Sequence, residues 1–147
     1  MAQPLDSSRV IDGTFGEVRQ DGRWLTNVYS VEANVSISYN DVSRSGTRWT
    51  GKKPGALEGT GTMTGYKVTS DLAKSIGSIT EDRGTPYVTE LIFKLDDPQS
   101  FGAERVRLKN VQFEQITLGN FEVGSIVEEE TPFNFDGYEF LDEITAG

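Results

Sequence analysis

The chain of 147 residues carries a formal net charge of -9 and contains neither cysteine nor histidine. Its length fits a single domain with its own core, so we expect one domain spanning residues 1–147. The missing thiols and imidazoles exclude disulfide frameworks, Cys- or His-based catalytic sites and nearly all zinc sites. We therefore expect no enzyme activity, no metal and no cofactor.

The charge is distributed unevenly along the chain. All 14 basic side chains precede residue 114, whereas the charged residues of 114–147 are acidic only. A nucleic-acid-binding domain needs a cationic face that displaces counterions from phosphates, so this distribution argues against one. The acidic segment is also rich in aromatic residues, which disordered tails lack, and we expect it to fold. No run approaches the ~20 apolar residues of a membrane span or resembles a signal peptide, which predicts a cytoplasmically made chain without a membrane anchor.

The first half of the chain predicts antiparallel β-structure. Asp21-Gly22 stands between two strand-like runs in residues 14–26, the signature of a two-residue type I′ hairpin. Residues 29–39 alternate strictly between apolar and polar side chains, which predicts a long strand with one face in the core. Residues 40–58 then read as a long, glycine-punctuated loop that leads into a threonine-rich strand over 59–68. Together these segments predict an extended hairpin.

The second half predicts one helix and further strands. Residues 68–82 have helical spacing, with Ser70 as N-cap and with Leu72, Ile76 and Ile79 on one face that would cover the sheet. Strand-like runs follow at 86–98, 102–113 and 128–141. The fold class is therefore mainly β, a β-sandwich or partly closed barrel with one α-helix.

The loop at 40–58 is the first candidate for a binding surface. A solvated, flexible hairpin tip is the simplest interpretation, but an aromatic side chain flanked by cations is typical of protein interfaces. We expect the loop to dock on a partner through Arg44, Arg48, Trp49, Lys52 and Lys53.

Few residues could carry catalysis or ligand binding. Paired carboxylates are the remaining catalytic possibility, yet clusters arise by chance among 23 acidic residues. Asp96 and Asp97, before Pro98, are typical turn formers. A carbohydrate-binding β-sandwich with Trp24 or Trp49 as a stacking platform is an alternative that composition leaves open.

Four stretches of the chain resemble one known family. They are VEANV at 31–35, TGKKPGALEGTGTMTGYKVTS at 50–70, LDDPQSFGAERVRLKNVQFEQITLGNFEV at 95–123 and EEETPFNFDGYEFLD at 128–142. Their content and order are similar to the tail tube protein of contractile-tailed bacteriophages, defective prophages and phage-tail-like bacteriocins of Gram-positive bacteria. One departure is Gly65, which stands where the family pattern has a bulky apolar residue.

The resemblance implies a structural subunit of the virion tail with a tail tube-like fold. In that family six copies close into a ring, and rings stack into a hollow tube that DNA transits without specific binding. The implied partners are copies of the same chain and the sheath, tape-measure, baseplate and terminator proteins. Another ring-forming tail component, such as a terminator or baseplate hub piece, is the alternative within the same fold.

Two further surfaces are expected from this picture. The polar side of the long strand would line the lumen through Ser30, Glu32, Asn34, Ser36 and Ser38. The basic loop would contact an acidic surface of another subunit, built from Glu128, Glu129, Glu130, Asp136 and Glu139. Opposite charges there would set docking register more than raw affinity.

Overall fold

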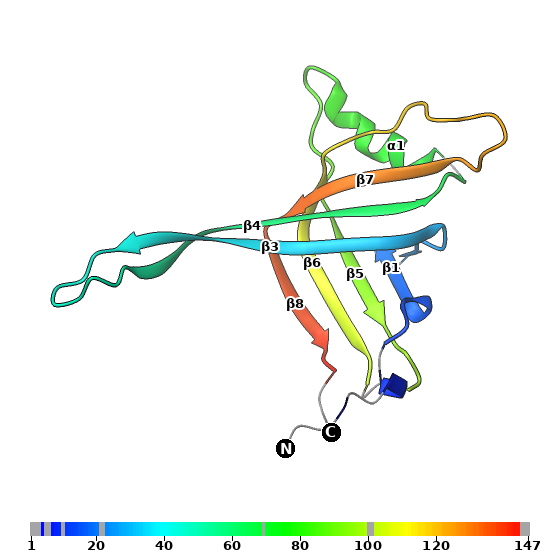
Figure 1. Ribbon diagram of the computed structural model, residues 1–147. Helices are drawn as coiled ribbons and strands as arrows, with labels where there is room; N and C mark the ends of the chain where they lie inside the picture. Colours follow the sequence, from blue (N-terminus) through cyan, green and yellow to red (C-terminus); the bar gives the residue numbers. More distant parts are fainter. Residues whose placement is uncertain are drawn as a thin grey trace.

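The computed structural model describes residues 4, 7–9, 11–20, 23–68, 70–99 and 102–144. This part of the chain is mainly β, with one short α-helix and three 3-10 turns (Figure 1). The strands and the helix are β1 (Gly16–Gln20), β2 (Arg23–Trp24), β3 (Val28–Val42), β4 (Gly51–Tyr66), α1 (Asp71–Ile76), β5 (Thr89–Leu95), β6 (Glu104–Phe113), β7 (Glu128–Phe135) and β8 (Gly137–Asp142). No helix in the described ranges is long and apolar enough to cross a membrane.

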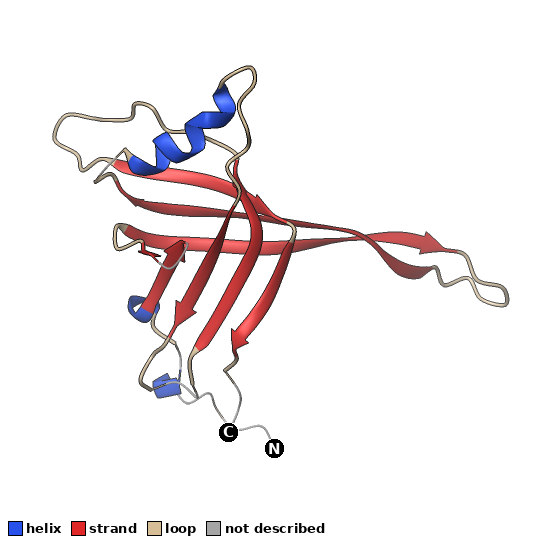
Figure 2. Ribbon diagram, turned by 180° about the vertical axis from the view of Figure 1, so that it is seen from behind, coloured by secondary structure: helices blue, strands red, loops and turns tan. Residues whose placement is uncertain are grey.

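The strands form an antiparallel sheet that folds over into two layers. Their order is β2-β1-β5-β6-β7-β4-β3, and β8 pairs with β6. One layer holds β1, β5, β6 and β8; the other holds β3, β4 and β7, whose strands cross the first layer steeply (Figures 1 and 2). The expected sandwich or partly closed barrel with one helix is therefore confirmed. β1 and β2 pair with Gln20 opposite Arg23, while the predicted Asp21-Gly22 turn itself lies outside the described residues.

β6 belongs to both layers, because it bends beside the turn that joins β7 to β8. β6 pairs with β8 up to Lys109 and with β7 at Gln112 and Phe113. Asn110, at the bend, has a positive φ of 54°, and its Nδ2 donates to the two Asp136 carboxylate oxygens at 2.9 and 3.1 Å. A residue in this conformation breaks the regular ladder and bends the strand, which lets one chain segment serve both layers.

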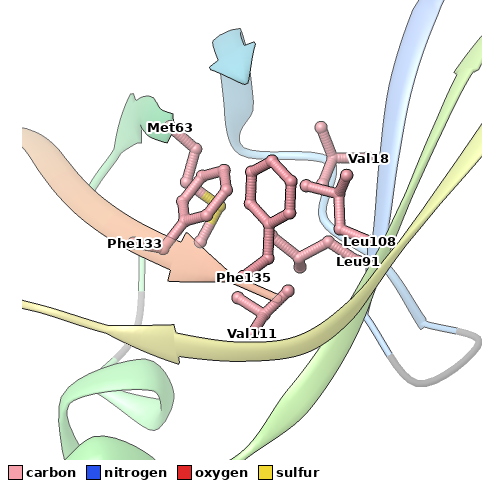
Figure 3. Close-up of a cluster of buried hydrophobic side chains, with 7 residues drawn as sticks. All are labelled: Val18, Met63, Leu91, Leu108, Val111, Phe133 and Phe135. Atoms are coloured by element: carbon pink, nitrogen blue, oxygen red, sulfur yellow. The ribbon is translucent and has the colours of Figure 1, made fainter. Parts of the chain in front are cut away.

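The core lies between the two layers. Phe133 of β7 is fully buried, and its ring centroid lies 6.4 Å from those of Phe93, Phe113 and Phe135. Figure 3 shows the buried cluster, which consists of Val18, Met63, Leu91, Leu108, Val111, Phe133 and Phe135. Burial of these side chains, each worth roughly 1.5–3 kcal/mol, holds the layers together.

Glycines of β4 make room for the two phenylalanines of β7. Gly59 pairs with Phe135 and Gly61 with Phe133, and a Cβ at either glycine would lie 2.5 Å from the opposing ring. Gly65 is also buried, and a Cβ there would lie 2.5 Å from the carbonyl oxygen of Asn27. Backbone therefore occupies the space that a side chain at position 65 would need in this chain.

The hairpin of β3 and β4 is extended, as predicted, but the loop assigned to residues 40–58 is wrong in extent. The two strands pair from Val28 and Gly65 out to Val42 and Gly51, so only residues 43–50 form the connecting loop. The glycine- and lysine-rich composition favours a loop locally, yet pairing with β3 satisfies the backbone and continues the ribbon. A register shift between Ile37 and Tyr39 accommodates Pro54, which faces Tyr39.

The apolar side of β3 is not a buried face, contrary to the prediction. Ala33 packs against the core, but Val35, Ile37 and Tyr39 are 39%, 48% and 56% exposed, and Tyr29 is half exposed. β3 is the edge strand of its layer, and its outer half extends past the other layer (Figure 1). Nothing within the described chain covers those side chains.

The helix is shorter than the predicted span of 68–82. α1 is continued by a 3-10 turn over Gly77–Thr80, and Ser70 occupies the N-cap position without a side-chain capping hydrogen bond. Ile76 is buried, whereas Ile79 is 47% exposed; the side chains of Asp71 and Leu72 lie outside the described set. Ala73 and Ile76 face Ile116, Glu129 and Thr131, so the helix covers the start of β7.

An arginine clamps three strands on the first layer's outer side. Arg107 of β6 bonds through Nε to Glu90 Oε2 of β5 at 2.5 Å and through Nη1 to Glu139 Oε1 of β8 at 2.9 Å. The hydrogen bond from Arg107, with the nearby charge of Lys109, lowers the pKa of Glu139. These side chains are partly exposed, so the clamp orients β8 more than it stabilises the fold.

Substituting Gly61 tests the packing of β7 on β4. Gly61→Ala places a Cβ 2.5 Å from the carbonyl oxygen of Glu32 and from the Phe133 ring, and such overpacking costs about 1–3 kcal/mol. Urea unfolding should show a correspondingly lower free energy of unfolding. Gly119→Ala is the matched control, because nothing lies within 4 Å of a Cβ there. Equal stability of the two variants would contradict the packing account.

Replacing Glu139 by glutamine tests the clamp through pH. Since the folded-state pKa of Glu139 is lowered, its stabilising contribution is complete above the ordinary carboxyl pKa of about 4.3 and is lost as pH falls through the lowered value. The stability difference between wild type and Glu139→Gln should thus be largest near neutral pH and vanish at strongly acidic pH. Unfolding curves at several pH values measure it; a pH-independent difference would refute the clamp.

Candidate functional site

The described chain presents a projecting ribbon instead of a closed pocket. We define the arm as residues 36–58, the part of the β3–β4 hairpin beyond the pairing of Gly59 with Phe135. β7 ends at Phe135 and the chain turns into β8, so β4 loses its second neighbour and the ribbon runs on alone (Figures 1 and 2). A two-stranded ribbon is marginal in water by itself, which makes the arm a candidate for stabilisation by another chain.

The tip of the arm presents an aromatic side chain between cations. Trp49 is 80% exposed, while its backbone is held locally. Its N–H donates to Thr47 Oγ1 at 3.2 Å, and its carbonyl accepts from Arg44 Nη2 at 3.4 Å. Arg48 lies beside it in the same loop and is also exposed. The structure therefore brings together three of the five predicted loop residues.

The two lysines predicted with them lie elsewhere. Lys52 and Lys53 are strand residues of β4, where successive side chains point to opposite faces. Lys52 faces Asp41 of β3 and forms an ion pair with its Oδ1. The charge of Lys52 is therefore matched within the arm, and the cationic cluster at the tip is smaller than the composition suggested.

The polar side of the β3–β4–β7 layer forms a continuous surface, which we call the polar face. Ser30, Glu32 and Asn34 pair directly with threonines of β4, and these threonines pair in turn with residues of β7. Ser36 pairs with Glu58 one position beyond the last β4–β7 pair, so the surface extends onto the base of the arm. Asn34 Nδ2 donates to Glu32 Oε1 at 2.9 Å. The polar face comprises Ser30, Glu32, Asn34, Ser36, Glu58, Thr60, Thr62, Thr64, Glu130, Pro132 and Asn134. These residues supply carboxylates, hydroxyls and amides, and none of them is a lysine or an arginine.

Four of the five residues predicted for a lumen surface thus belong to one face. They are exposed and point away from the core, because Ala33, Met63 and Phe133 occupy the alternate positions of the three strands. Ser38, the fifth, is exposed on the arm next to the register shift that follows Ile37.

The acidic residues predicted as one partner surface are not brought together. Glu128, Glu129 and Glu130 begin β7, whereas Asp136 and Glu139 follow its end, roughly 20–25 Å further along at ~3.3 Å per residue. Several have partners in the same chain: Glu129 pairs with Lys67 at 3.3 Å, and Asp136 and Glu139 are held by Asn110 and Arg107. The acidic segment is therefore partly compensated by basic residues of neighbouring strands.

Two tyrosines and a glutamate lie at the end of the β3–β4–β7 layer where β3 and β7 begin and β4 ends. The rings of Tyr29 and Tyr66 lie 4.9 Å apart at 36°. Partial burial, followed by the interaction with the Glu128 carboxylate, raises the pKa of Tyr29. This phenol is thus a neutral hydrogen-bond donor at physiological pH.

One exposed feature escaped the sequence analysis. The segment of residues 115–127, between β6 and β7, holds Leu118, Phe121, Val123 and Ile126, which are 86%, 82%, 94% and 76% exposed. A sequence signal does exist, since apolar residues here follow neither strand nor helix periodicity and are interspersed with Gly119 and Gly124. We call this segment the apolar loop.

The other residues considered for catalysis or ligand binding lie in ordinary structural positions. Asp97 is buried and accepts from the backbone N–H groups of Asp12 and Gln99, both at 2.9 Å, as expected of a turn former. Across the described ranges no three acidic side chains gather to hold a metal ion. Trp24 lies on β2 and Trp49 at the arm tip, on separate elements.

Comparison with known proteins identifies the family. The model of the phage tail tube protein family matches residues 3–142. Phage-like element PBSX protein XkdM of Bacillus subtilis (strain 168) is 34% identical over 143 residues, covering 96% of this chain and 97% of that protein.

Solved structures share the fold at low sequence identity. One is a chain of the sheath–tube complex of an extracellular contractile injection system, PVC, in the extended state. It matches with a TM-score of 0.68 at 16% identity, and the match covers 97% of this chain and 93% of that chain. The tube-terminating cap of the anti-feeding prophage gives 0.70 at 13% identity, with 97% and 94% coverage. The four resembling stretches, the family match and the B. subtilis relative agree that this chain belongs to the phage tail tube protein family and is a tail tube subunit.

Proposed function

We propose that this tail tube subunit closes into six-membered rings that stack into a hollow tube, through which DNA passes inside a contractile sheath. The observation that carries the proposal is the open β3–β4–β7 layer, with an unpaired edge, a polar cation-free face and a projecting arm. The family match and the sheath–tube complex among the fold's neighbours support it.

Ring closure follows from the edges of the sheet. β3 has 15 residues, and among the residues that the structure describes it pairs on one side only, with β4. A long exposed edge is a template for uncontrolled pairing, and closing a ring pairs each edge with a neighbour. Six-fold closure is taken from the family, in which the inner strands of neighbouring copies join into one barrel.

The polar face would then line the bore. It lies on the side of the layer opposite the core, and Glu32, Glu58 and Glu130 give it a negative charge. Lysines and arginines bind DNA by releasing the counterions of its phosphates. A surface without them gains no such affinity, so a moving duplex is not retained. The other layer, which holds β1, β5, β6 and β8, would face the sheath.

The remaining partners and the setting are part of the same proposal. The tape-measure protein would occupy the bore during assembly, and baseplate and terminator proteins would meet the two tube ends. The chain would be made in the host cytoplasm and would act without catalysis or cofactor.

A ring-forming terminator is the second candidate function, favoured by the similarity to a tube-terminating cap. Electron microscopy of purified protein separates them, because only a tube subunit forms long filaments of uniform diameter.

Removing the arm tip's anchor should weaken stacking. The double substitution Arg48→Ala and Trp49→Ala leaves β3 and β4 intact but removes an 80% exposed aromatic side chain, and such aromatic anchors typically contribute about 2 kcal/mol, or roughly thirtyfold in affinity. We expect shorter tubes by electron microscopy and more unassembled protein by sedimentation. Lys52→Ala is the matched control, since Asp41 already neutralises that lysine. Tubes of normal length from the double variant would rule out a stacking role for the tip.

Reversing charge on the polar face should affect transport without affecting assembly. Glu32→Lys combined with Glu58→Lys places cations on a surface that otherwise has none, and phosphates would then be retained in the bore. Particles built with this variant should assemble normally and eject DNA more slowly. Asp82→Lys, exposed in a turn outside the polar face, controls for net charge. An unchanged ejection rate in the double variant would exclude this face from the lumen.

A further inference from the structure

The apolar loop is held in a defined shape although its side chains are exposed. At its ends, Glu114 N–H donates to the Pro132 carbonyl and Lys67 N–H to the Val127 carbonyl, both at 2.9 Å. Within it, Asn120 Nδ2 donates to the Glu128 carbonyl at 3.2 Å, and Ser125 N–H to the Glu122 carbonyl at 3.1 Å, beside Gly124 with φ 88°. The loop therefore presents its apolar side chains from a fixed base.

Such exposure has a cost that isolated proteins rarely carry. Phe121 and Val123 are more than four-fifths exposed, and each apolar side chain kept in water forgoes the favourable free energy of its burial. Clusters of this kind mark sites of protein contact. None of the four exposed apolar side chains of the loop belongs to the core cluster of the described residues, so these four are available to another chain.

A matching surface lies at the base of the arm. Ile37 and Leu57 are paired across β3 and β4 on the side that faces the core further along the strands, and they are 48% and 67% exposed. Beside them a groove of about 270 Å³ opens between the arm and the start of β8, lined by Val35, Leu57, Gly59, Phe135, Asp136, Gly137 and Tyr138. Its floor is the rim of the core, since Phe135 belongs to the buried cluster. We call this surface the arm-base groove.

The two apolar surfaces cannot meet within one molecule. The apolar loop leads into β7 at Glu128, and the arm-base groove lies where β7 ends at Phe135, roughly 25 Å apart at ~3.3 Å per residue. Figures 1 and 2 show the β6–β7 connection at one end of the β3–β4–β7 layer and the arm projecting from the other. Two different surfaces at opposite ends suit head-to-tail contact, which forms open-ended polymers.

We propose that the apolar loop of one copy docks into the arm-base groove of a copy in the adjoining ring, with Phe121 as its aromatic anchor. The partner is a second copy of this chain, because a tube subunit must stack through two different, mutually complementary ends. This inference rests on the proposed function and assigns its ring-to-ring contact. An aromatic side chain in a desolvated groove is the usual form of a binding hot spot, and repetition around the ring multiplies each contact.

Engineered disulfides test the contact directly, because the native chain has no cysteine. The double variant Phe121→Cys and Leu57→Cys, assembled into tubes and oxidised, should give a ladder of linked copies on a non-reducing gel. A head-to-tail contact links every copy to two others, whereas either single-cysteine variant can form dimers at most. Phe121→Cys combined with Glu143→Cys is the matched control, since Glu143 is exposed beyond β8, and it should give no ladder.

A charge substitution gives the second measurement. Phe121→Asp should leave rings intact and stop their stacking, with at least a tenfold loss of tube mass in sedimentation. Val88→Asp, an exposed apolar position outside both surfaces, should stack as wild type does. Tubes that give no ladder from the Phe121→Cys and Leu57→Cys double variant, or normal tubes from Phe121→Asp, would overturn this contact and leave the proposed function standing. Wild-type protein that forms no tubes would overturn the proposed function and this contact with it.

Discussion

The packing of Phe133 and Phe135 against Gly61 and Gly59 is the interaction on which the rest of the structure depends. The two rings leave no room for a side chain at either glycine. They also belong to one buried cluster with Leu91, Leu108 and Val111 of the β1–β5–β6–β8 layer, and this cluster joins the two layers. Because side chains alternate along a strand, fixing this face toward the core also fixes the opposite one toward solvent. The polar face is therefore a direct consequence of core packing.

The same packing explains why the molecule is incomplete by itself. The core ends at Phe135, but β3 and β4 continue beyond it as a ribbon with exposed apolar side chains on one side and an unpaired edge along β3. The apolar loop exposes another set at the far end of the layer. These surfaces would be liabilities in a monomer. In the tube of identical copies proposed above they would become contacts, in keeping with the phage tail tube protein family to which this chain belongs.

The charged side chains pair with one another more than their distribution along the sequence suggests. Arg105, Arg107 and Lys67 pair with acidic residues of the C-terminal segment, at Asp142, Glu139 and Glu129. Folding places these distant segments side by side, so the acidic excess of the C-terminal segment is partly compensated by basic residues from elsewhere in the sequence. The polar face is the exception, since none of its residues is a lysine or an arginine and it therefore keeps a negative charge.

The amino-acid sequence by itself determined the family, the mainly β fold, the two faces of β3 and the position of the single helix, because periodicity, turn residues and motif order are local properties. Tertiary structure alone decided how far the β3–β4 ribbon runs, since pairing with β3 overrode the loop-like composition of residues 51–58. It also decided that Val35 and Ile37 are uncovered, that Lys52 and Glu139 have partners within the chain, and that the apolar loop stands free. Alternation states which side chains share a face, but whether anything covers that face depends on neighbours far away in the sequence.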